Sequence, residues 1–94
     1  MFSSFEEAEA FVQDVIGRTR NGEIKWVATD EGFIQEGWSR LPSFFLFGED
    51  PSTLILRASS ENFDVVVDCR ANPAHAQSLA QLCAAIKQKN NLLF

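Results

Sequence analysis

The sequence contains no tyrosine, one histidine and two cysteines, and only eight basic residues accompany thirteen acidic ones. Two cysteines are too few for a disulfide scaffold, and the spacing of Cys69 and Cys83 matches no zinc motif. The shortage of lysine and arginine argues against binding to nucleic acid, because phosphate contacts need clustered basic side chains. The chain also lacks a glycine-rich phosphate loop, an H-E-x-x-H motif and a G-x-S-x-G motif, so we expect no cofactor, no metal and no catalytic site.

Long hydrophobic runs are missing too. No stretch approaches the ~20 apolar residues of a membrane span. Residues 1–9 show neither the basic start nor the apolar segment of a secretory signal. We therefore expect no membrane partner and a cytoplasmic location.

What is present is typical of one small globular domain covering residues 1–94. Hydrophobic residues make up 46% of the chain and charged residues 22%. Aromatic content is uneven, with nine phenylalanines and two tryptophans. Because phenylalanine carries no polar group, these rings favour complete burial in a core or an interface.

Charge is unevenly distributed, although the net charge is only −5. Residues 23–69 contain nine acidic and three basic side chains, whereas residues 70–94 contain three basic and no acidic ones. An acidic surface can attract a basic protein surface. One alternative function is therefore an acidic inhibitor or decoy that binds a basic partner through residues 23–69.

Two helices are expected, one at each end of the chain. Serines 3 and 4 precede glutamates 6 and 7 by three residues, which is the spacing of a capping box, and an apolar stripe of helical period continues to about residue 20. Asn72 followed by Pro73 is a strong start signal for a second helix, which Asn90 and Asn91 should end. The apolar residues 92–94 should then pack against the domain.

Five strand candidates lie between these helices, at residues 24–29, 33–38, 44–47, 53–58 and 63–69. The links between them are short, and parallel pairing needs a crossover of a dozen or more residues. We therefore predict an α+β fold of order α-β-β-β-β-β-α, in which the strands form an antiparallel meander.

The run of apolar residues at 44–47 is the most informative part of the sheet. Side chains alternate between the two faces of a strand, so this strand is apolar on both faces. Two helices about 10 Å across cover only about one face of a five-stranded sheet roughly 24 Å wide. One predicted face holds Ile24, Trp26, Ile34, Leu54, Leu56, Val65 and Val67, and the other holds Val27, Phe33, Ile55 and Val66 beside polar residues.

We expect both helices to cover the first face and the second face to bind another protein. A non-catalytic interaction or regulatory module that forms a homodimer fits this arrangement best. The predicted contact residues are Phe33, Phe45, Phe47, Ile55 and Val66, and Phe44 and Leu46 exchange with Phe45 and Phe47 if the strand points the other way. Two arrangements would remove the free face: one helix on each side of the sheet, or a bulge that shifts the strand faces.

Cys69 and His75 offer a third possibility, a small-ligand-binding or thiol-dependent enzyme domain. Cys69 ends the last predicted strand, and His75 stands in the first turn of the second helix. A thiol beside an imidazole can act as a nucleophile with its base. The sequence shows no third group to orient them, so a buried Cys69 and a structural His75 are the favoured interpretation.

Overall fold

The computed structural model describes residues 2–30, 32–36, 43–48, 50–60 and 63–89. Helix α1 spans Phe5–Arg20 and helix α2 spans Ala76–Lys89. Ser4 is the N-cap of α1 and its hydroxyl accepts from the Glu7 amide, as half of the predicted capping box requires, but the Glu7 carboxylate accepts from the Ser3 amide and not from Ser4. Acidic side chains in the first turn of α1 and basic ones in its last turn suit the helix dipole.

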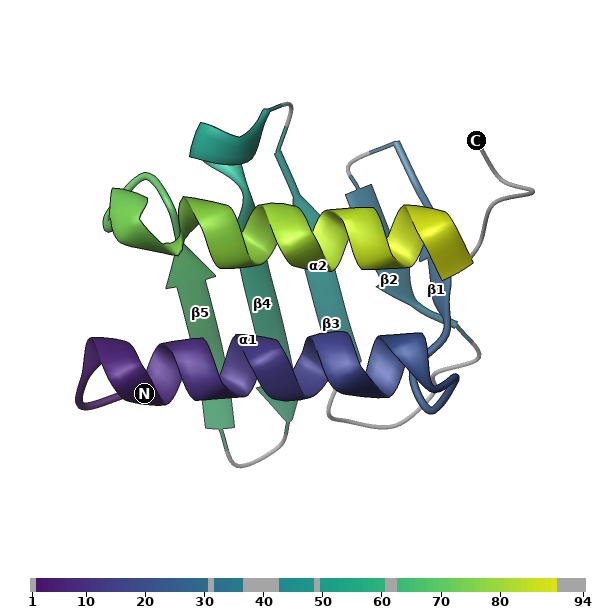
Figure 1. Cartoon of the computed structure of the whole chain (residues 1–94), viewed down its shortest axis with the longest axis horizontal. Helices are drawn as coiled ribbons and strands as arrows, with labels where there is room; N and C mark the ends of the chain where they lie inside the picture. Colours follow the sequence, from purple (N-terminus) through teal and green to yellow (C-terminus); the bar gives the residue numbers. More distant parts are fainter. Residues whose placement is uncertain (1, 31, 37–42, 49, 61–62, 90–94) are drawn as a thin grey trace.

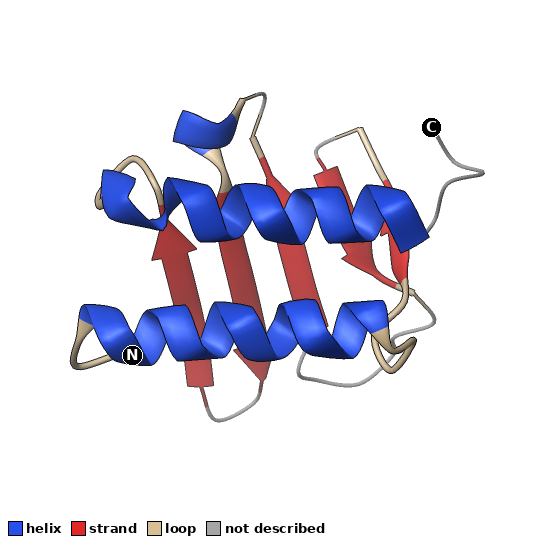
Figure 2. Ribbon diagram, in the orientation of Figure 1, coloured by secondary structure: helices blue, strands red, loops and turns tan. Residues whose placement is uncertain are grey.

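The five strands are β1 (Trp26–Ala28), β2 (Gly32–Gln35), β3 (Ser43–Phe47), β4 (Ile55–Ser60) and β5 (Phe63–Asp68). They form one antiparallel sheet in the order β1-β2-β3-β4-β5, which confirms the predicted α+β meander. Figure 2 shows this sheet behind the two helices.

Both helices cover the same face of the sheet and run side by side in the same direction, from the β5 edge towards the β1 edge (Figure 1). One core lies between the helices and the strands. Its fully buried side chains include Val12, Val15, Ile16, Trp26, Leu46, Leu56, Leu79, Leu82 and Ile86. The expectation that both helices share one face is therefore confirmed for the described residues.

The junction from α1 to the sheet is fixed by a buried polar chain. The Trp26 indole Nε1 donates to Thr19 Oγ1 over 2.9 Å, and Thr19 Oγ1 donates to the Val15 carbonyl over 2.8 Å. Thr19 is 0% exposed and Trp26 only 2%. The indole can therefore be buried without leaving its N–H unpaired.

Two short 3₁₀ helices refine the predicted boundaries. Pro51–Thr53 forms η1 and Pro73–His75 forms η2, so residue 53 belongs to a turn and α2 starts three residues after Pro73. The side chain of Asp50 caps η1, and the side chain of Asn72 caps η2. Asn72 and Pro73 thus mark the start of helical structure as predicted, with a tighter first turn. Residues 90–94, including the predicted helix end and the apolar residues 92–94, lie outside the described part.

The predicted faces of the second strand were wrong. Thr29 and Gly32 exchange backbone hydrogen bonds, so the β1–β2 loop has two residues and Ala28 pairs with Phe33. Phe33 therefore shares the helix-covered face with Trp26, and Ile34 points to the other side. The predicted strands 24–29 and 33–38 leave a three-residue turn at 30–32, and a one-residue shift in register moves every side chain to the opposite face.

Candidate functional site

The helix-free face of the sheet is the candidate site, and strand register defines its members. One row crosses all five strands through Val27, Ile34, Phe45, Arg57 and Val66. A second row passes through Gly32, Phe47, Ile55 and Asp68, and a third through Ser43, Ser59 and Asp64. Directly opposed residues in antiparallel strands share a face, so these three rows form one surface.

Apolar side chains are partly exposed on this surface. Val66 is 47% exposed, Val27 38% and Ile34 37%, whereas Leu46 and Leu56 on the other side are nearly inaccessible. In the described part of the chain, the only other large hydrophobic residue with comparable exposure is Phe5. The helix-free face therefore combines three exposed β-branched residues, one from each edge strand and one from β2.

Two ion pairs involve the acidic side chains of these rows, Asp64 with Arg57 and Asp68 with Arg70. Arg57 on β4 donates to both oxygens of the Asp64 carboxylate on β5, at 3.3 Å from Nε and 2.9 Å from the terminal nitrogen. The Ser59 hydroxyl donates to the same carboxylate over 3.0 Å. The bonds from Arg57, followed by the bond from Ser59, lower the pKa of Asp64 below its usual value.

A second ion pair lies where β5 ends. Arg70 donates from its backbone amide and from its side chain to the Asp68 carboxylate, with distances of 2.8 to 3.2 Å. The side-chain bond from Arg70 is the largest cause of a lowered pKa at Asp68. Asp64 and Asp68 therefore stay ionised at neutral pH, and each has a cationic partner.

Of the five predicted contact residues, four lie on the helix-free face by register and Phe33 does not. Val66 is exposed on the helix-free face, and Phe47 is half-buried in its second row. Ile55 lies on this face by register but is buried, at 4% exposed. Phe33 belongs to the helix-covered core, and the register places Phe45 in the central row although its side chain lies outside the described part. As contact residues, these five remain a prediction.

Sequence reasoning left two residues of this face out of the predicted contact set, and both are on the β1–β2 hairpin. Ile34 was assigned to the helix side, and Val27 was placed on the correct face but not chosen as a contact. A two-residue loop between Thr29 and Gly32 is the signal that would have found Ile34, because it fixes the pairing of Val27 with Ile34.

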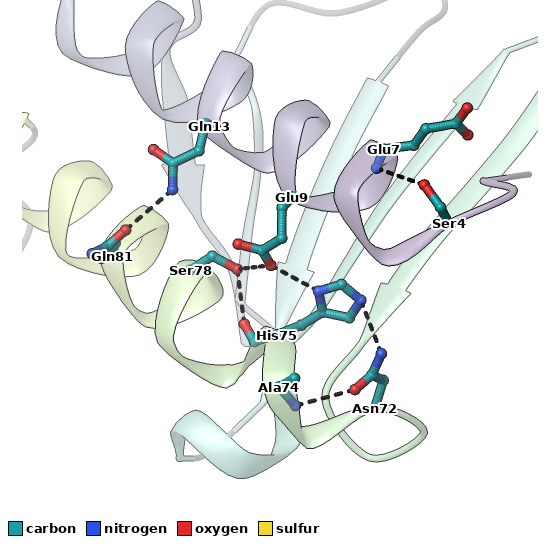
Figure 3. A network of polar contacts seen from close by, with 9 residues as sticks. All are labelled: Ser4, Glu7, Glu9, Gln13, Asn72, Ala74, His75, Ser78 and Gln81. Carbon is teal, nitrogen blue, oxygen red and sulfur yellow. Dashed lines mark hydrogen bonds and ion pairs between the residues drawn. The ribbon is translucent and has the colours of Figure 1, made fainter.

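A second polar cluster ties the start of α2 to α1 (Figure 3). His75 Nδ1 lies 2.8 Å from a Glu9 carboxylate oxygen, and the Ser78 hydroxyl lies 2.8 Å from the same oxygen. His75 Nε2 lies 3.5 Å from the Asn72 side-chain amide. The ring of Phe5 stacks on the imidazole at 4.6 Å between centroids. A neutral imidazole that donates from Nδ1 and accepts at Nε2 satisfies both contacts.

This arrangement gives His75 a structural role. Both ring nitrogens face partners other than a thiol, and the His75 side chain is only 7% exposed. Cys69 is 1% exposed, and burial, followed by the negative charges of Asp68 and Glu9, raises the pKa of its thiol. A raised pKa makes the nucleophilic thiolate scarcer. The geometry therefore gives no support to a Cys69–His75 nucleophile and base.

Other site types find little support. Within the described ranges, no group of three or more histidine, cysteine or acidic side chains could hold a metal ion. No helix in the described part has the length and apolar character needed to cross a membrane. Comparisons with protein-family models, curated proteins and solved structures find no match to this chain.

Proposed function

We propose that this chain is a non-catalytic protein-interaction module that forms a homodimer through the helix-free face of its sheet. The observation that carries the proposal is the packing of both helices on one side, which leaves Val27, Ile34 and Val66 partly exposed on the other. Transfer of such side chains out of water is favourable, at about 25 cal/mol per Å² of apolar surface. A second copy of the face supplies that burial.

A self-complementary face suits a twofold dimer, because the same surface is used by both copies. The apolar row of one copy can lie on that of the other, and the Arg57–Asp64 pair brings both signs of charge. This pair is already internally neutral, so covering it leaves no unmatched charge. An acidic face with no cation would instead have repelled its own copy.

The size of the face predicts a weak dimer. Five strands at about 4.8 Å and about five residues at 3.4 Å give a flat area of roughly 400 Å² for each copy. Stable complexes usually bury about 800 Å² of accessible surface per partner. The expected contact is therefore smaller than that of a standard stable complex, and the dimer should dissociate on dilution.

A non-catalytic role and a cytoplasmic location complete the proposal. The polar cluster around His75 holds two helices together, and the thiol of Cys69 is buried. Both cysteines are free thiols, which is the ordinary state in a reducing compartment.

Size-exclusion chromatography with light scattering over a concentration series tests the proposal. Wild type should move from the monomer mass to the dimer mass as concentration rises. Ile34→Lys and Val66→Lys should stay monomeric, because each places an unpaired ammonium within the proposed contact. Ala10→Lys, at an exposed position on α1, is the matched control and should behave as wild type.

Circular dichroism checks that each variant is folded. A wild-type protein that stays monomeric throughout the series contradicts the proposal. A dimer that persists in both folded lysine variants also contradicts it, because the contact then lies elsewhere on the molecule.

A further inference from the structure

A groove lies beside α2, and two of its lining residues, Gly32 and Phe47, also belong by register to the second row of the helix-free face. The groove is open to solvent, has a volume of about 810 Å³ and lies between this helix, the β1–β2 hairpin and the η1 turn. Its apolar walls include Phe33, Phe47, Leu54, Ala80, Cys83 and Ala84. Pockets for small molecules usually measure about 300–1,000 Å³ and have mostly apolar walls.

Small side chains on the helix keep this groove open. Ala80, Cys83 and Ala84 present short side chains where leucines would have filled the space. Phe33 is 8% exposed and therefore held firmly by the core. Phe33 therefore gives the groove an aromatic surface that is fixed by core packing.

The opposite wall is held by close backbone packing. A Cβ placed on Gly32 would lie 1.7 Å from the Leu46 carbonyl oxygen, and one on Gly48 would lie 2.5 Å from the Thr53 oxygen. Both glycines line the groove. A side chain at either position would therefore clash with the backbone of the neighbouring segment, so glycine sets the shape of this wall.

Charges at the groove favour a cationic ligand. Asp30, Asp50 and Lys87 are its charged lining residues among those described, so acidic groups exceed basic ones. The Ser52 hydroxyl and amide hydrogen-bond to the Asp50 carboxylate and lower its pKa, which keeps it ionised. We propose that this groove binds a small molecule with an apolar, ring-sized body and one ammonium group.

Three probes with the same body and different charge test this proposal: 4-phenylbutylamine, 4-phenylbutanol and 4-phenylbutyrate. Cys83 lines the groove and is half-buried, so its alkylation rate reports occupancy. Cys69 is 1% exposed and serves as the internal reference. Mass spectrometry of the iodoacetamide-treated full-length chain should show that the amine slows alkylation of Cys83 at the lowest concentration. The alcohol should protect Cys83 only at a higher concentration, and the carboxylate should protect it least.

Variants separate shape from charge. Ala84→Phe fills the groove from an exposed helix position and should abolish protection by all three probes. Asp30→Asn and Asp50→Asn should each weaken the amine about two- to five-fold, which is typical of exposed charge pairs, and leave the alcohol unchanged. Lys87→Gln should strengthen the amine by a similar factor.

Several results would overturn the inference. It fails if no probe protects Cys83, if the carboxylate protects best, or if Ala84→Phe protects like wild type. It also fails if protection appears only in the full-length variant Leu93→Ser/Phe94→Ser, because the chain's own C-terminal residues then occupy the groove. Protection that rises with protein concentration, in the absence of any probe, would identify a second copy as the occupant. The sheet-face dimer is tested separately by Ile34→Lys and Val66→Lys, because neither residue lines the groove.

Discussion

Replacing Thr19 with valine should destabilise the protein without changing the shape of its core. The two side chains have nearly the same volume, but valine cannot accept the hydrogen bond that the Trp26 indole donates over 2.9 Å. Both residues are essentially inaccessible to water, so the indole N–H has no replacement partner from solvent. The substitution therefore removes the two hydrogen bonds of the Thr19 hydroxyl without creating a cavity, and only the bond from Trp26 leaves a buried donor unpaired.

The expected cost is about 1–3 kcal/mol, the penalty for leaving a buried donor unpaired. Domains of this size are stable by only about 5–15 kcal/mol, so the effect is large. Urea unfolding followed by circular dichroism at 222 nm measures it, with an unchanged slope and a lower midpoint. Thr29→Val is the matched control, because Thr29 is exposed and water can replace its contacts, and we expect a change of at most about 0.5 kcal/mol.

A double-mutant cycle identifies the bond itself. In a Trp26→Phe background the donor is gone, so Thr19→Val should lose most of its penalty, with a coupling of about 1 kcal/mol or more. An equal penalty in both backgrounds would refute the reasoning, because the threonine would then act through something other than the indole. A destabilisation of Thr19→Val no greater than that of Thr29→Val would refute it as well.

Three further predictions follow from the same structure. Gly17→Ala should stabilise the protein by about 0.5–1 kcal/mol, because nothing lies within 4 Å of the added carbon. Gly32→Ala should cost about 3 kcal/mol or more, because Gly32 has a φ of +152° and its Cβ would overlap a carbonyl oxygen. The Arg70 guanidinium lowers the pKa of Asp68 in the folded protein. The stabilisation from this ion pair is therefore complete above the ordinary pKa of 3.8 and disappears as the pH falls through the lower pKa of the folded state. The urea midpoint of Asp68→Asn should then depend less on pH below about 4 than the midpoint of wild type does. Dithionitrobenzoate should titrate Cys83 rapidly in the native protein and Cys69 only on unfolding, and simultaneous reaction of both would contradict the burial of the second thiol.

The architecture could be predicted from sequence because its signals are local. The capping residues around Ser4 and the Asn72–Pro73 pair mark where helical structure begins, and short links between strands exclude parallel pairing. The order of the sheet follows from the same short links. None of these inferences needs the position of one side chain relative to another distant in the chain.

The candidate sites were harder to predict from the sequence, because they depend on single-residue register and on contacts between residues far apart in the chain. Because the predicted turn between the first two strands was one residue too long, Phe33 and Ile34 were each assigned to the wrong face of the sheet. The groove beside α2 unites residues from three separate segments, and no spacing in the sequence marks it. The partnership of Glu9 with His75 likewise joins residues 66 positions apart.

The burial pattern of α2 explains why the helix-free face stays uncovered. Helix α2 buries Leu79 and Ile86, and it also buries Ser78, Leu82 and Ala85. These three follow a spacing of four and three residues, so they share a side of the helix, and Ser78 on that side contacts Glu9 of α1. Helix α2 is therefore buried against both the sheet and α1. Moving it to the other face would expose Leu82 and break the contact with Glu9, so the uncovered face is a fixed property of this packing.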